Sequence, residues 1–114
     1  MKAVIASKQF GVLVVIINRQ RPKLCPTYTL VKTKAVVANP ADYLYLTFRM
    51  GPNGSSLGNN YVGIVEEVGA GVLRDFKVGD RVCRCTRGGN PGRLENGIDA
   101  EYVVLKSDVQ TNTP

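Results

Sequence analysis

The 114-residue chain has no histidine and no tryptophan, and only three cysteines. Without histidine neither a Ser-His nucleophile nor a histidine-ligated zinc site can form, and no carboxylate pair has glycosidase spacing. An odd number of cysteines does not make a disulfide framework and suits a reducing compartment. We expect Cys83 and Cys85 to pack as small residues in or near the core, and we expect no metal.

Long hydrophobic runs are also missing. No apolar run approaches the length of a membrane-spanning helix, and the N-terminus does not resemble a signal peptide, so we expect a cytoplasmic protein without a membrane partner. The net charge is +6, but no nucleic-acid-binding module is evident. The basic residues are therefore interpreted as solvated surface, with an anionic ligand or an acidic protein partner as the alternatives.

What the sequence does contain is a series of β-strand patterns. β-Branched and aromatic residues recur in short runs that turn residues separate. Residues 11–18 are almost continuously apolar, which predicts a strand buried on both faces. Within residues 27–38 we expect Val31, Thr33, Ala35 and Val37 to share one face. The other predicted strands are residues 1–7, 61–68, 81–85 and 99–105.

Glycine and proline divide these strands. Gly63 suggests a bulge or a close backbone approach, and the glycines of residues 69–71 end a strand and permit positive φ. Phe76 is expected to fill the core beneath the turn at Gly79 and Asp80. A short helix is predicted over residues 40–50, with irregular loops at 51–57 and 86–97. The expected fold is mainly β, a small bent β-barrel with one or two short helices.

Three segments together resemble one family. They are GIVEEVGAGVLRDFKVGDRV at residues 63–82, VKTKAVVANPAD at 31–42 and GIDAEYVV at 97–104. This combination resembles the GroES-like N-terminal domain of medium-chain dehydrogenases/reductases. Within that family the chain is most similar to the zinc-free enoyl reductases that act in trans on fungal polyketide synthases.

The resemblance implies a two-domain enzyme whose second, Rossmann domain binds NAD(P)H. No G-x-G-x-x-G motif occurs here, so we expect residues 1–114 to be a single GroES-like domain without a nucleotide-binding domain or bound cofactor. The family's zinc ligands fall at Asn39 and at Asn59-Asn60, which again predicts no metal. Relatives complete this fold with segments that return after the Rossmann domain. Without them strand edges stay uncovered, and we expect a homodimer to cover them.

Three functions follow as hypotheses. The first is a cofactor-independent enzyme or ligand-binding protein that orients a reactive, apolar polyketide-like polyene for cyclisation or isomerisation. The second is a truncated substrate-binding domain of an NADPH-dependent enoyl reductase. The third is a non-catalytic module that docks on a polyketide synthase.

Seven residues match the family's substrate cleft and are the candidate substrate-binding set, although no catalytic residue is assigned. Tyrosine and asparagine would donate hydrogen bonds, and an arginine would hold developing negative charge. Each has a structural alternative: a helix cap for Asn39 and Asp42, packing for the tyrosines, and a solvated loop charge for Arg87. The set is Asn39, Asp42, Tyr45, Asn60, Tyr61, Arg87 and Asn90.

Overall fold

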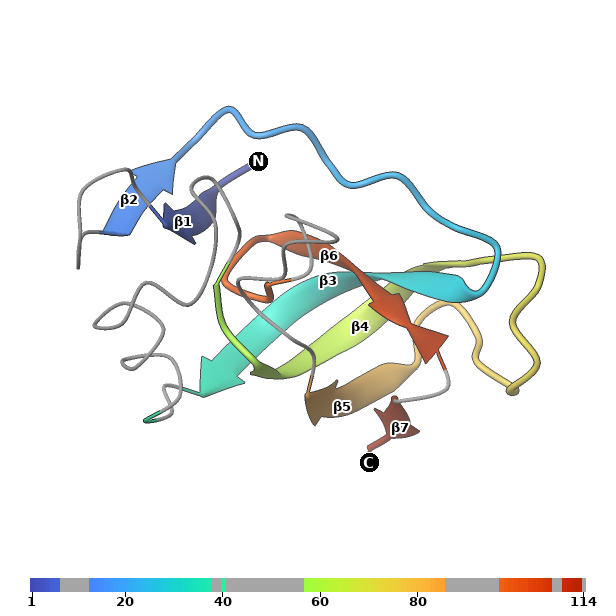
Figure 1. The fold of residues 1–114 in the computed structure, drawn as a ribbon. Coiled ribbons are helices and arrows are strands. Elements are labelled where there is room, and N and C mark those ends of the chain that lie inside the picture. The colour runs from blue at the N-terminus through green and yellow to red at the C-terminus, as the bar shows by residue number, and fades with distance from the viewer. Residues whose placement is uncertain (7–12, 38–39, 41–56, 86–96, 108–109, 114) are drawn as a thin grey trace.

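The chain is mainly β in the computed structural model, which describes residues 1–6, 13–37, 40, 57–85, 97–107 and 110–113. Five strands form an antiparallel sheet in the order β6-β3-β4-β5-β7, and β1 pairs with β2 as a separate antiparallel unit (Figure 1). The strands are β1 Ala3–Ala6, β2 Leu13–Ile16, β3 Tyr28–Val37, β4 Asn60–Val68, β5 Arg81–Cys85, β6 Tyr102–Lys106 and β7 Thr111–Asn112.

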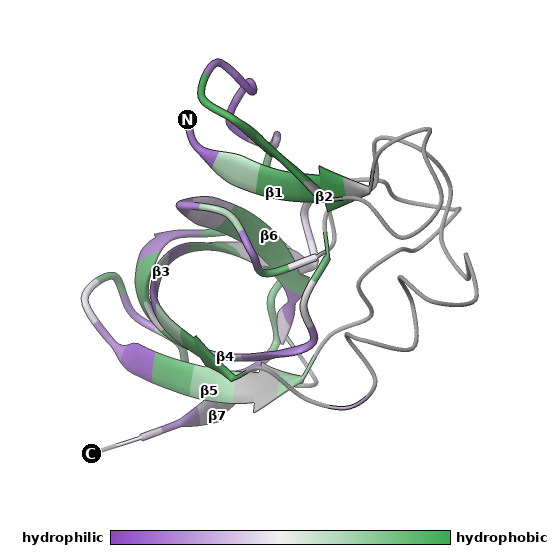
Figure 2. Cartoon of the chain, turned by 90° about the vertical axis from the view of Figure 1, so that its left-hand side faces the viewer, coloured by the Kyte–Doolittle hydropathy of each residue, from purple (hydrophilic) through white to green (hydrophobic). Residues whose placement is uncertain are grey.

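The larger sheet is strongly curved, and Figure 2 shows β3 and β4 bending around its interior, with the β1–β2 pair lying to one side. The register between β3 and β4 shifts twice, between Leu30 and Val31 and between Thr33 and Ala35. Such bulges bend a strand and increase its twist. The predicted small, bent, mainly β domain is therefore confirmed.

The core lies on the concave side of this sheet. Val31, Val65 and Val82 are buried from three neighbouring strands, and Phe76 closes the core from the turn before β5, as predicted. Along β5 the buried Val82 lies between the exposed Arg81 and the half-buried Cys83, which confirms the period-two pattern. The remaining buried members of the core cluster are Tyr61, Ile98, Val103 and Leu105.

Gly63 marks the close approach that the sequence predicted. A Cβ atom at this position would overlap the Val31 side chain and would lie 2.7 Å from the Lys32 carbonyl oxygen. The break after β4 is also confirmed, although the glycines of residues 69–71 do not use the positive φ that glycine permits. Among the described glycines, Gly58 and Gly79 adopt positive φ.

Residues 97–101 connect three parts of the fold, and we call them the 97–101 junction. The junction precedes β6 in the sequence and extends the pairing between β6 and β3 by one bond. In this bond the Thr33 N–H donates to the Glu101 carbonyl at 2.9 Å. It then crosses to β1, because the Val4 N–H donates to the Asp99 carbonyl at 2.7 Å. The Asp99 N–H also donates to the Leu57 carbonyl at 2.9 Å. The junction thus holds β1, β3 and the start of β4 in one arrangement.

One strand prediction is wrong in its burial. Residues 11–18 were expected to be covered on both faces, but β2 pairs with β1 alone among the described strands. Val14 and Val15 point to opposite faces and are 39% and 65% exposed, and Ile17 is 72% exposed. A continuous apolar run indicates a buried-type strand, but it does not say which part of the molecule provides the cover.

Three further details differ from the sequence expectations. The bulges break the expected alternation in β3, so that Thr29, Leu30 and Val31 are consecutively buried while Ala35 is exposed. Of the two cysteines expected in or near the core, Cys83 is half-buried and Cys85 is exposed. The short strand β7 was not predicted.

Some predictions lie outside the described residues. These are the helix predicted over residues 40–50, apart from Pro40, and the loops, apart from Leu57 and Gly97. No helix in the described part of the chain has the length and apolar character needed to cross a membrane.

Gln110 joins the C-terminal segment to the buried side of the sheet. Its side chain is fully buried, and its Nε2 donates to the Thr29 hydroxyl and to the Leu105 carbonyl, the latter at 3.2 Å. The Gln110 carbonyl accepts a 2.8 Å bond from Arg74 Nη1. Buried polar groups that bond in this way stabilise a fold mainly because leaving them unpaired is costly.

We predict that Gln110→Ala lowers the free energy of unfolding by about 2–4 kcal/mol, because it removes two buried hydrogen bonds and leaves a cavity. Thr111→Ala, at an exposed neighbouring position, should change it by less than about 0.5 kcal/mol. Urea denaturation of both variants followed by circular dichroism measures the difference. Equal losses of stability would contradict a structural role for the Gln110 amide.

Candidate functional site

Three strands meet beside Asn60, at one end of the curved sheet. Asn60 opens β4 and is paired on one side with Val37, the last residue of β3, and on the other with Cys85, the last residue of β5. In the sequence Asn39 and Arg87 follow Val37 and Cys85 by two residues. They lie outside the described residues, as do Asp42, Tyr45 and Asn90.

The two candidate residues that the structure describes point to opposite faces of β4. Tyr61 is 3% exposed and belongs to the core cluster, which agrees with the packing alternative for this side chain. Asn60 is half-buried and shares the outer face with Val62 and Ile64, because successive side chains of a strand alternate. The structure therefore does not bring Asn60 and Tyr61 to one surface. Their role in substrate binding stays a prediction.

A hollow of about 450 Å³ lies on this outer face, and we call it the β4–β5 hollow. Val62 and Ile64 provide apolar lining, and Lys34 and Arg81 bring two positive charges to it. Small-molecule sites are commonly apolar hollows of this size with a few polar groups that fix orientation. The hollow can therefore hold a short hydrocarbon segment beside an anionic or carbonyl group. Gly63 and Thr113 complete its lining.

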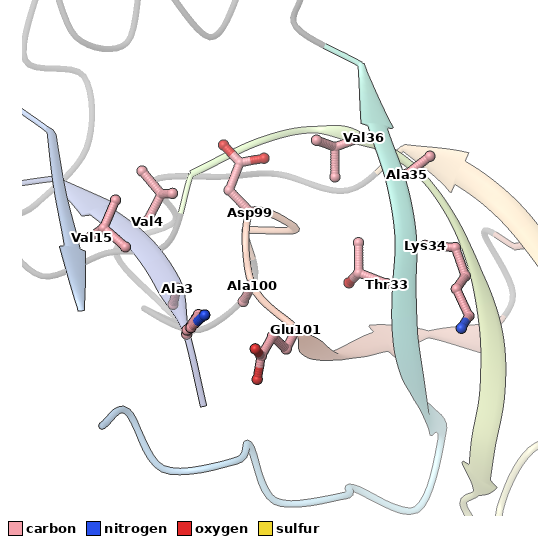
Figure 3. A pocket seen from close by; sticks show the side chains of 11 residues that line it. Ala3, Val4, Val15, Thr33, Lys34, Ala35, Val36, Asp99, Ala100 and Glu101 are labelled. Carbon is pink, nitrogen blue, oxygen red and sulfur yellow. The ribbon is translucent and has the colours of Figure 1, made fainter. Parts of the chain in front are cut away.

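A second hollow, of about 300 Å³, separates β2 from β3, and we call it the β2–β3 hollow. Figure 3 shows Val4 and Val15 on one side, Thr33 and Val36 on the other, and the 97–101 junction between them. The Thr33 hydroxyl is buried and has no hydrogen-bond partner among the described residues. Two lysines and two carboxylates also line this hollow, namely Lys2, Lys34, Asp99 and Glu101.

Gly58 determines the path of the backbone that leads into β4 at Asn60. Its φ is +91°, and a Cβ atom would overlap the Asp99 carboxylate and lie 2.9 Å from Ile98 Cδ1. The Ile98 N–H also donates to the Gly58 carbonyl at 3.4 Å. Only glycine adopts this φ without strain, so the residue at 58 determines how β4 begins.

The described residues do not provide a metal centre or a dinucleotide cradle. No group of three or more histidine, cysteine, aspartate or glutamate side chains gathers among them. All pairings between the described strands are antiparallel, whereas a dinucleotide-binding unit needs parallel strands joined through a helix.

Sequence reasoning located the end of the sheet but missed both hollows. The outer-face residues Val62 and Ile64 carry a signal, because they alternate with Tyr61, Gly63 and Val65 along β4. No sequence pattern indicates that Lys34 and Arg81 lie near one hollow, since only the bulged β3–β4 pairing and the β4–β5 register bring them together.

Comparisons with known proteins place the chain within one family. The family model described as the alcohol dehydrogenase GroES-like domain matches residues 25–114. Trans-enoyl reductase TOXD of Cochliobolus carbonum is 43% identical over 97 residues, which cover 85% of this chain and 32% of that protein. Trans-enoyl reductase resD of Aspergillus sclerotiorum is 40% identical over 100% of this chain and 31% of its own length.

A solved structure gives the same result for the fold. Pseudomonas syringae quinone oxidoreductase superposes with a TM-score of 0.82 at 30% identity, over 99% of this chain and 33% of that chain. The chain thus spans about a third of the length of the curated relatives it matches. The family resemblance and the GroES-like fold expected from the sequence are confirmed.

We predict that Gly58→Ala destabilises the fold more than Gly79→Ala. Both glycines have positive φ, at +91° and +93°, but a Cβ atom at Gly79 would have no neighbour within 4 Å. Backbone strain should cost each variant about 1–2 kcal/mol, and the overlap with Asp99 and Ile98 adds to this cost at position 58. Parallel urea titrations measure both. Equal destabilisation would show that the Asp99 contact does not restrain the start of β4.

Proposed function

The chain belongs to the alcohol dehydrogenase GroES-like domain family, and on that premise we propose that it is the substrate-binding part of an enoyl reductase that acts on polyketide intermediates. The supporting observation is the similarity to trans-enoyl reductases along the chain, at 43% and 40% identity. The β4–β5 hollow is the surface to which we assign the substrate, and Asn60 lies on the same outer face of β4 as its lining residues Val62 and Ile64. The substrate class is an α,β-unsaturated acyl thioester with an apolar chain.

In this proposal the chain binds and orients the acyl group. Val62 and Ile64 pack against the hydrocarbon, and the charges of Lys34 and Arg81 attract the anionic phosphopantetheine that carries polyketide intermediates. Enoyl reduction places negative charge on the thioester oxygen as hydride reaches the β-carbon. A side-chain donor at that oxygen stabilises the charge, and the amide of Asn60 is the donor we assign.

The hydride would come from NADPH, the cofactor implied by the enoyl reductase relatives. The described residues do not fit a dinucleotide, since their strand pairings are antiparallel throughout. We therefore derive no step through the cofactor, and the role of this chain is limited to substrate binding and orientation.

The comparisons favour this function over a cofactor-independent cyclase, because the named relatives are reductases. The cyclase hypothesis and the synthase-docking hypothesis remain distinct outcomes of one experiment. The purified chain is mixed with a trans-enoyl pantetheine thioester, with and without NADPH, and both binding and turnover are followed.

We predict saturable thioester binding, with amide chemical-shift changes in β4 at Val62 and Ile64, and no turnover by this chain alone. NADPH-dependent reduction should appear when the nucleotide-binding part of TOXD is fused to the chain. A rearranged product formed without NADPH would support the cyclase instead. Binding to an acyl carrier protein but not to the free thioester would support docking.

A variant pair tests the role of Asn60. Asn60→Ala should weaken thioester binding by about fivefold, the effect of one hydrogen bond worth about 1 kcal/mol. Asn112→Ala changes an exposed asparagine on β7 and should leave the affinity unchanged. Equal affinities for the two variants would remove Asn60 from the proposed site.

A further inference from the structure

Two cysteines of β5 lie on the outer face of the sheet. The register places Cys85 opposite Asn60 and Cys83 opposite Val62. Directly opposite residues of an antiparallel pair point to the same face, with their Cβ atoms about 5 Å apart. Both thiols therefore lie on the face that carries the β4–β5 hollow, and we call Cys83 and Cys85 the β5 thiol pair.

The two thiols are accessible to an unusual degree for their residue type. Cysteine is among the most buried residues of folded proteins, but Cys85 is exposed and Cys83 is half-buried, and neither forms a disulfide. A thiol that reaches solvent can lose its proton, and the resulting thiolate is a nucleophile. The β5 thiol pair is therefore available to an electrophilic ligand on this face.

The proposed substrate has its electrophilic atom at the level of these thiols. The hydrocarbon packs against Val62 and Ile64, and the thioester oxygen lies at the Asn60 amide. The β-carbon, two bonds from the thioester carbon, then lies between Asn60 and Val62. On β5 the residues opposite this interval are Cys85 and Cys83. Residues two apart on a strand are separated by about 7 Å, so the β-carbon has one sulfur on either side of it along the strand.

We propose that the β5 thiol pair captures the enoyl group as a thioether when no hydride is delivered, an inference that rests on the proposed function. A thiol of the pair loses its proton to water, and the thiolate attacks the β-carbon. A carbon–sulfur bond forms, and the carbon–carbon π bond breaks. The π electrons move to the thioester oxygen, where the Asn60 amide stabilises the charge. Water then protonates the α-carbon, so the step consumes no oxidant or reductant.

This capture distinguishes an unreduced chain from a reduced one. Hydride and thiolate compete for the same β-carbon, and a chain that has received hydride no longer has a double bond to attack. The thioether also reverts when the α-proton is removed and the thiolate leaves, which restores the enoyl group. The β5 thiol pair thus holds the unreduced acyl chain on the substrate surface and does not retain the reduced product.

Mass spectrometry of the intact chain and of its peptides tests the proposal, with trans-hexenoyl pantetheine thioester as the probe. The pair should gain the full mass of the thioester, at a rate that saturates with thioester concentration. Cys25, half-buried like Cys83 but located before β3, is the internal control. Acrylamide calibrates the access of a small acceptor to each thiol. After this calibration the pair should react at least about tenfold faster than Cys25, because binding raises the effective concentration of the electrophile.

Variants and a competitor locate the reaction. The double variant Cys83→Ser/Cys85→Ser should lose the saturable addition, whereas Cys25→Ser should keep it. Hexanoyl pantetheine thioester has no double bond and should slow the addition to the wild-type chain, because it occupies the same surface. The competition is measured on the wild-type chain and does not depend on how the variants fold.

Binding of the hexanoyl thioester, followed by the amide chemical shifts of Val62 and Ile64, separates this inference from the proposed function. If the hexanoyl thioester binds there but the hexenoyl thioester modifies the three cysteines in the ratio that acrylamide sets, the capture is wrong and the proposed function stands. If neither thioester binds, both are wrong. A gain of the acyl mass alone, with loss of pantetheine, would show attack at the thioester carbon and would also overturn the capture.

Discussion

The backbone hydrogen bonds of the 97–101 junction are the constraint on which the other features depend. Through Glu101 the junction extends the β6 side of β3, and through Asp99 it bonds to β1 and to Leu57. One short segment cannot run beside both β3 and β1, so the junction separates from β3 at Thr33. The β2–β3 hollow lies at this point of separation. The same segment bonds to Leu57 and Gly58 and so sets where β4 begins. The position of Asn60 in the candidate site therefore depends on the backbone of this junction.

Much of the sheet could be predicted from local patterns. The run from Tyr61 to Val68 and the alternation around Val82 are short-range signals, and both strands lie where the sequence places them. The bulges in β3 could not be predicted, since they arise from its pairing with β4. The bond between Gln110 and Thr29 joins residues 81 positions apart, and no local pattern indicates it. The prediction that β2 is buried was wrong for the same reason, because which segments cover a strand is decided by the whole fold.

The candidate site shows what can be predicted when residues are matched to the motif of a family. Asn60 and Tyr61 were chosen together because they are adjacent in a matched motif, but adjacency in a strand sends two side chains to opposite faces. Tyr61 entered the core, and Asn60 remained beside the outer face with Val62. The residues that line the β4–β5 hollow come from β3, β4, β5 and the C-terminal segment. Such a set is visible only once the register is known.

The two hollows are almost separate surfaces. Among the residues lining the two hollows Lys34 is shared, and no residue of β2 lines the β4–β5 hollow. If one substitution changed both hollows, Lys34 would have to connect them, because it is the residue that lines both.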